Sequence, residues 1–86
     1  MIRILENLFN PLGFLMDNIK GAEERILKEV ESDSSHLAKR GYVWGTIHSL
    51  GIFRDCFAES YGEKNKGIKR FSEGIDELAQ KYSQYL

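Results

Sequence analysis

Histidine, aspartate, glutamate and cysteine are the side chains that most often bind metals or transfer protons, and one stretch of this sequence holds all four. His48, Asp55 and Glu59 occupy relative positions i, i+7 and i+11. In a helix these positions share one face, and Cys56 lies beside them. They spread over three turns, so one ion would also need ligands from another helix, and no Glu-x-x-His or His-x-x-x-His spacing occurs. A solvated helix face is the simpler interpretation, and a small enzyme or metal-binding bundle is the alternative.

Four basic residues form a second group that could bind a ligand. They are Lys64, Lys66, Lys69 and Arg70. Such a cluster could contact phosphate groups, so nucleic-acid binding is one interpretation. Acidic residues surround the cluster, however, and cations at the start of a helix oppose its dipole. We therefore expect a solvated connector here and no nucleic-acid partner.

Arg54 lies within an otherwise apolar arc of the predicted helix, between Leu50 and Phe57. A guanidinium in such a position needs an acidic partner or a route to water. If the two last helices form an antiparallel hairpin, Arg54 stands level with Gly74, which acidic residues flank. Two interpretations follow: Arg54 pairs with an acidic group of the last helix or of a binding partner, or its head group extends to solvent at the rim.

The last helix is the element that the sequence defines most clearly. Large apolar residues recur every three or four positions, which predicts a helix over 67–86. The stripe consists of Ile68, Phe71, Ile75, Leu78, Tyr82 and Tyr85. Side chains of this size on one edge must pack against another helix or another molecule.

A helix over 11–31 begins at the Asn10–Pro11 pair, in which asparagine caps the helix and proline takes its first position. The predicted buried stripe is Met16, Ile19, Ile26 and Val30, flanked by Leu15 and Leu27. Glu23 falls within this stripe, where an apolar residue is expected. We interpret it as an edge residue whose carboxylate reaches water.

The middle of the chain predicts a helix over 35–61, capped by Ser34 or Ser35. Its predicted buried stripe is Val43, Ile47, Leu50, Phe57 and Tyr61, with Trp44, Phe53 and Ala58 widening the face. A strand or hairpin over 42–53 is the competing interpretation, because glycine, β-branched and aromatic residues are frequent there. In a helix, Gly41, Gly45 and Gly51 predict close contact with a neighbouring helix, whereas turns would explain them otherwise.

The first ten residues are apolar enough to form a short amphipathic helix that ends before Pro11. Ile2, Leu5 and Phe9 would share its apolar face. Its charges are balanced, so the basic flank that holds a helix on an anionic membrane is missing. We expect this segment to contact the core or a second subunit, with a partner's groove or a membrane surface as alternatives.

Composition limits the class of protein. The 86 residues include 42% hydrophobic residues and carry a formal net charge of −1, which indicates a globular chain without a strong field for a charged polymer. A core of this size gives a small margin of stability, so self-association is expected. The single cysteine and the absence of a secretory apolar region favour a reducing compartment, the cytoplasm.

Together these patterns predict an all-α fold, with one helical domain over 1–86. Three main helices, near 11–31, 35–61 and 67–86, and the short N-terminal amphipathic helix would form a small bundle with antiparallel neighbours.

The predicted function is that of a non-enzymatic protein-interaction module, such as an adaptor, an inhibitor, an assembly subunit or a chaperone, that self-associates as a homodimer. No cofactor or metal is expected. The candidate interaction residues are Arg54, Phe9, Trp44, Tyr82, Tyr85 and Leu86.

Overall fold

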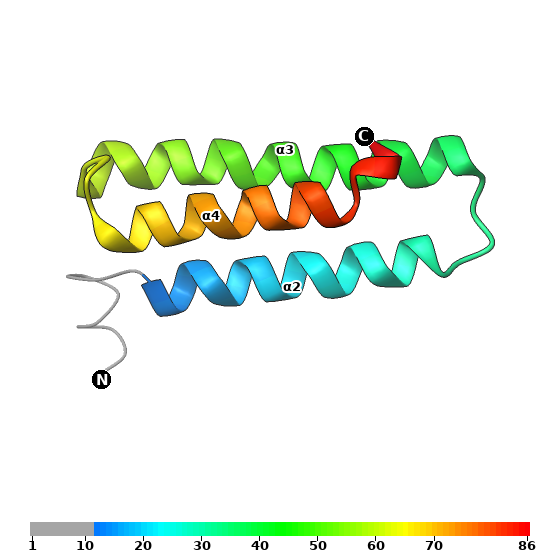
Figure 1. The fold of residues 1–86 in the computed structure, drawn as a ribbon, viewed down its shortest axis with the longest axis horizontal. Coiled ribbons are helices and arrows are strands. Elements are labelled where there is room, and N and C mark those ends of the chain that lie inside the picture. The colour runs from blue at the N-terminus through cyan, green and yellow to red at the C-terminus, as the bar shows by residue number, and fades with distance from the viewer. Residues whose placement is uncertain (1–11) are drawn as a thin grey trace.

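A computed structural model describes residues 12–86, and three helices account for most of that range (Figure 1). Helix α2 spans Leu12–Val30, α3 spans His36–Tyr61 and α4 spans Lys66–Lys81, followed by the short 3-10 helix η1 over Ser83–Tyr85. The described residues contain no strand, so the strand interpretation of 42–53 is wrong and the all-α prediction is confirmed. The predicted N-terminal helix, with Phe9, lies outside the described residues.

Polar side chains define where the helices begin. Ser35 adopts an extended backbone conformation, and its hydroxyl accepts a hydrogen bond of 3.1 Å from the amide of Ala38, so Ser35 caps α3. The side chain of Asn65 caps α4 by accepting bonds from the amides of Gly67 and Ile68. Gly62 ends α3 with a positive φ of 90°, a conformation that glycine adopts without steric cost.

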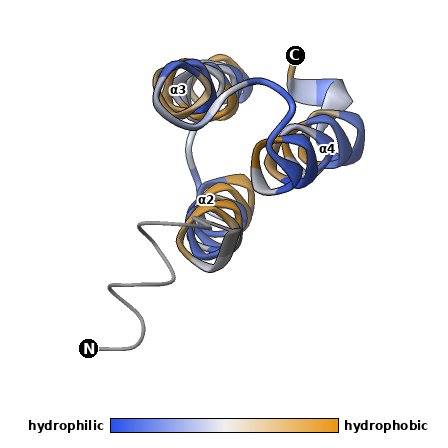
Figure 2. Ribbon diagram, turned by 90° about the vertical axis from the view of Figure 1, so that its left-hand side faces the viewer, coloured by the Kyte–Doolittle hydropathy of each residue, from blue (hydrophilic) through white to orange (hydrophobic). Residues whose placement is uncertain are grey.

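The two connectors are short, and the chain reverses direction at each. In Figure 1, α3 runs opposite to both α2 and α4, so α2 and α4 are parallel. All three helices contact one another. Figure 2 shows them end on: α4 turns its hydrophobic side towards the other two helices and its hydrophilic side outward.

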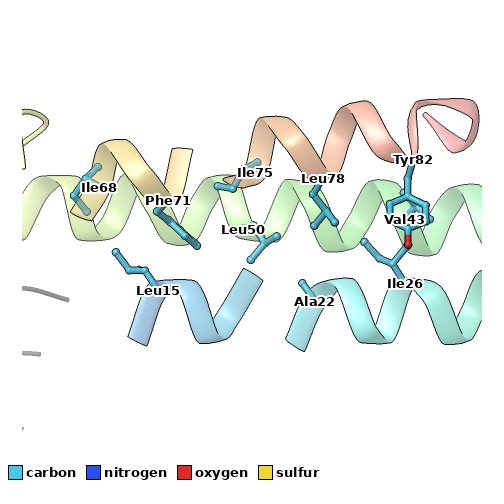
Figure 3. Close-up of a cluster of buried hydrophobic side chains, with 10 residues drawn as sticks. All are labelled: Leu15, Ala22, Ile26, Val43, Leu50, Ile68, Phe71, Ile75, Leu78 and Tyr82. Carbon is cyan, nitrogen blue, oxygen red and sulfur yellow. The ribbon is translucent and has the colours of Figure 1, made fainter. Parts of the chain in front are cut away.

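The core lies between the three helices and is apolar (Figure 3). Helix α4 contributes the most to it, as its stripe predicts. The buried hydrophobic residues are Leu15, Ala22, Ile26, Val43, Leu50, Ile68, Phe71, Ile75, Leu78 and Tyr82. No polar or charged residue among those described is buried. Phe71 is the largest side chain that is fully buried, so it anchors the packing.

The buried side of α2 differs from the predicted one by about one position. Leu15, Ala22 and Ile26 are fully buried, whereas Ile19 and Val30 are only partly buried at the edge of the core. The prediction centred the stripe on Met16 and Glu23 because it gave no weight to alanine. Ala22 is small, and it suits a position where two helices come close together.

Helix α4 is shorter than the predicted 67–86. Tyr82 leaves the helical conformation, with φ −112° and ψ 26°, and η1 follows. The turn brings Tyr85 against α3, where its ring lies 5.5 Å from that of His36. Packing against α3 therefore replaces the last turn of the predicted helix.

Candidate interaction surface

The candidate metal ligands of the sequence, His48, Asp55, Glu59 and Cys56, do not come together in the fold. Within residues 12–86, no group of three His, Cys, Asp or Glu side chains lies close enough together to hold a metal ion. His48 instead stacks on Trp44, with ring centroids 4.6 Å apart and planes inclined by 10°. Cys56 is exposed and free. The face that carries His48 thus combines an aromatic pair with exposed polar groups.

The basic cluster lies in the connector before α4 and in its first turns. Lys64, Lys66, Lys69 and Arg70 are all exposed. Arg70 forms an ion pair of 3.3 Å with Glu73, one helical turn later. The acidic residues near the cluster therefore neutralise part of it, as the sequence indicates.

Arg54 pairs with its sequence neighbour and not with α4. Its guanidinium lies 3.2 Å from the carboxylate of Asp55. The predicted space beside Gly74 is occupied by Ile19, because a Cβ added at Gly74 would lie 3.4 Å from that side chain. Glu23 bonds to Lys81 at 3.4 Å, which links α2 to α4 at the surface and confirms Glu23 as an edge residue.

A second stripe with large exposed apolar residues runs along α3 on the side away from its buried residues, Val43 and Leu50. We call it the outer face; its residues are Leu37, Gly41, Trp44, His48, Gly51, Ile52 and Asp55. Leu37 is 78% exposed, Trp44 is 56% exposed and Ile52 is 54% exposed. The sequence predicted that Trp44 widens the buried face of α3. This prediction is wrong, because Trp44 lies on the outer face.

The chain's C-terminal residues lie beside the outer face. An open groove of about 290 Å³ is lined by Leu37, Arg40, Gly41, Trp44, Tyr85 and Leu86. Both C-terminal residues border this groove; Leu86 is 43% exposed there, and Tyr85 is partly buried. Tyr82, by contrast, is part of the core and cannot reach a partner. Trp44, Tyr85 and Leu86, three of the predicted interaction residues, thus lie together.

The glycines of α3 do not have the role that the sequence predicted. A Cβ added at Gly41, Gly45 or Gly51 would meet no atom within 4 Å, so none of them allows a close contact within the protein. Glycine in the interior of a helix costs about 1 kcal/mol relative to alanine. Packing within residues 12–86 therefore gives no reason for these three glycines.

A second groove lies between α2 and α3. Its volume is about 500 Å³, and it is lined by Asn18, Arg25, Gly41, Tyr42, Gly45, Thr46, Ser49, Leu50 and Phe53. At the Phe53 end, Phe14 of α2 contacts Phe53 and Phe57 of α3, with ring centroids 6.0 and 5.9 Å apart. Polar groups make up much of the rest of the lining, so this groove offers a partner less continuous apolar surface than the outer face does.

Sequence reasoning did not single out Leu37 and Ile52. The signal was present, because Leu37, Trp44, His48, Ile52 and Asp55 recur at intervals of three, four or seven along α3. The helix thus carries two stripes on opposite sides. The buried stripe has more apolar residues, so the sequence-based interpretation considered that side alone.

Comparison of the chain with protein-family models, with curated proteins and with solved structures gives no match. Among the described residues, no helix is long and apolar enough to cross a membrane.

Proposed function

We propose that the chain is a non-enzymatic protein-interaction module that binds through the outer face of α3. One observation carries this proposal: Leu37, Trp44 and Ile52 are all more than half exposed along one side of one helix. Isolated exposed hydrophobic residues are normal on a protein surface, but several in one line are typical of binding sites. Tryptophan is also among the residues that most often dominate binding energy.

The position of the C-terminal residues also supports the proposal that the outer face is a binding site. Leu86 and Tyr85 border the groove that Leu37 and Trp44 line, so the apolar area continues from α3 onto the end of the chain. Arg40 lines the same groove, and Asp55 lies at the far end of the outer face, so charged groups accompany the apolar side chains. A hydrophobic centre with a charged margin is the usual anatomy of a protein interface.

We further propose that the module self-associates and that it works in the cytoplasm. A chain of 86 residues has a small core, and covering the outer face in a dimer would add to it. Cys56 is free and exposed, a state that a reducing compartment preserves.

The proposal is tested by capture with two matched variants. Leu37→Asp places a charge on the outer face, whereas Leu27→Asp makes the same change at an exposed leucine of α2. Tagged wild type and both variants are cross-linked in a lysate of the source cells, and the captured proteins, including untagged copies of the chain, are identified by mass spectrometry. We expect Leu37→Asp to lose proteins that wild type and Leu27→Asp both retain. Identical capture by all three, with circular dichroism showing all three folded, contradicts the proposal.

A further inference from the structure

We infer that the occupant of the outer face is a second copy of this chain, with the two α3 helices packed antiparallel around a two-fold axis beside position 46. This inference rests on the proposed function and names its partner. In such a pair, residues equally far from position 46 on opposite sides face one another across the interface.

Four pairs of residues on or beside the outer face lie equally far from position 46, and one pair, Gly41 and Gly51, is identical. Trp44 and His48 lie two positions away on either side, and Gly41 and Gly51 lie five positions away. A two-fold interface requires that if one residue contacts a second on the partner, the second also contacts the first. A two-fold pair about position 46 therefore places each of these residues opposite its counterpart at the same distance, and the two need to be compatible, not identical.

The centre of the interface consists of aromatic rings. Trp44 faces His48 of the second copy, and His48 faces Trp44 of the second copy. Because these two rings already stack on one another within one chain, the four rings form one continuous apolar centre. Such a centre excludes water where hot-spot residues usually lie.

The dimer gives the two glycines next to this centre, Gly41 and Gly51, a structural role. Gly41 faces Gly51 of the second copy on one side of the axis, and the same pair recurs on the other side. Absent side chains allow two helix backbones to approach closely. The protein places nothing within 4 Å of a Cβ at either position, as is also true of Gly45, so both positions are open to contact with a second copy.

The ends of the interface fix the antiparallel direction. Leu37 faces Asp55 of the second copy and Arg40 faces Ile52, one helical turn away. The diagonal contacts are therefore Leu37 with Ile52 and Arg40 with Asp55, which match apolar with apolar and cation with anion. Arg40 forms no ion pair with another described residue, whereas Asp55 already pairs with Arg54 of its own chain and would be shared between the two cations. A parallel pair would instead place Arg40 beside Arg40 and Asp55 beside Asp55, where like charges repel.

The large apolar side chains of the outer face provide less than half of the area that one partner buries in a standard interface. Leu37, Trp44 and Ile52 together expose roughly 350 Å² of side chain, against about 800 Å² per partner in a stable interface. The remainder comes from the residues between them and from Leu86, which borders the same groove. In the dimer these three side chains supply the largest apolar contacts, and the residues around them supply the rest of the buried area.

The test uses the single native cysteine. A spin label on Cys56 of the wild-type protein measures the distance between two copies of α3 by pulsed electron resonance. The antiparallel pair places the two labels ten residues on either side of the axis, a separation of roughly 30 Å along the helices. A parallel pair would bring them within roughly 15 Å. A labelled Cys56→Ser control measures the background.

Glycine variants give the second arm of the test. Gly41→Ala and Gly51→Ala each add a methyl group where the backbones meet, so each raises the dimer dissociation constant at least about tenfold. Gly13→Ala, at an exposed glycine of α2 that is equally open, leaves the constant unchanged. A separation far from 30 Å, an unchanged constant in both variants, or a monomer at all concentrations up to about 1 mM overturns the inference. In each of these cases the capture experiment with Leu37→Asp still decides the proposed function separately.

Discussion

The ring of His48 lies flat against the indole of Trp44, with centroids 4.6 Å apart, on a side of α3 that no other described helix covers. Stacked rings at a solvent-exposed position hide one face of each ring and leave the others in contact with water. Figure 2 shows that α3 differs from α4 in carrying hydrophobic residues on more than one side. Helix α3 thus presents a second side with large apolar residues to solvent.

Trp44 is the only tryptophan of the sequence, so its fluorescence reports on the outer face alone. Because association moves the indole from water into an apolar contact, we expect its emission maximum to shift to shorter wavelength as the protein concentration rises. Leu37→Asp should abolish this shift, whereas Leu27→Asp should preserve it. An emission maximum that is independent of concentration in the wild type would count against self-association at this surface.

Gly51→Ala should have opposite effects on the monomer and on the dimer. Alanine favours the helix, so the free energy of unfolding of the monomer should rise by up to about 1 kcal/mol, since the added Cβ meets nothing. The same methyl group should weaken association. Urea denaturation at low protein concentration measures the first effect, and sedimentation measures the second. A variant that is more stable and equally dimeric would remove Gly51 from the interface.

The pairing of Arg40 with Asp55 of the second copy can be examined by charge reversal. Arg40→Glu and Asp55→Arg should each weaken association by roughly tenfold, because each places like charges together. The double variant exchanges the two charges and should recover most of the affinity, and the coupling is read from the double-mutant cycle. Asp55 also pairs with Arg54, so Arg54→Met is the control for that contact. Additive losses in the double variant would exclude the proposed pair.

Phe71 should dominate the stability of the fold. Its side chain is fully buried where α4 meets the other helices, so Phe71→Ala should lower the free energy of unfolding by about 3–5 kcal/mol. Phe14→Ala removes the same ring at a partly exposed position of α2, and we expect a loss of less than half that size. Thermal and urea denaturation followed by circular dichroism compare the two. Equal losses would show that the core is not centred on α4.

The sequence predicted the helices well because their boundaries depend on local chemistry. The side chain of Ser35 caps α3, and the backbone conformation of Gly62 ends it. The apolar residues of α4 lie on one side only, so its buried face is unambiguous. For α2, in contrast, alanine and glutamate at 22 and 23 left two adjacent stripes possible. Only the packing against the other helices shows that Ala22 is the buried one.

The candidate site was predicted in part. Trp44, Tyr85 and Leu86 were selected from the sequence and lie together, but Tyr82 is buried and Phe9 lies outside the described residues. Trp44 was assigned to the wrong side of α3, because a helix with apolar residues on two sides does not reveal from its sequence which side faces the core. The role of Leu37 depends on that orientation, so it could be recognised only from the fold.

Sedimentation equilibrium of the wild type beside Leu37→Asp tests the central claim most directly. If the outer face of α3 binds a second copy, the wild type approaches twice the chain mass of 9.9 kDa as its concentration rises. Leu37→Asp then remains near 9.9 kDa over the same range. A wild type that stays monomeric, or a Leu37→Asp variant that dimerises as strongly as the wild type, would contradict the claim.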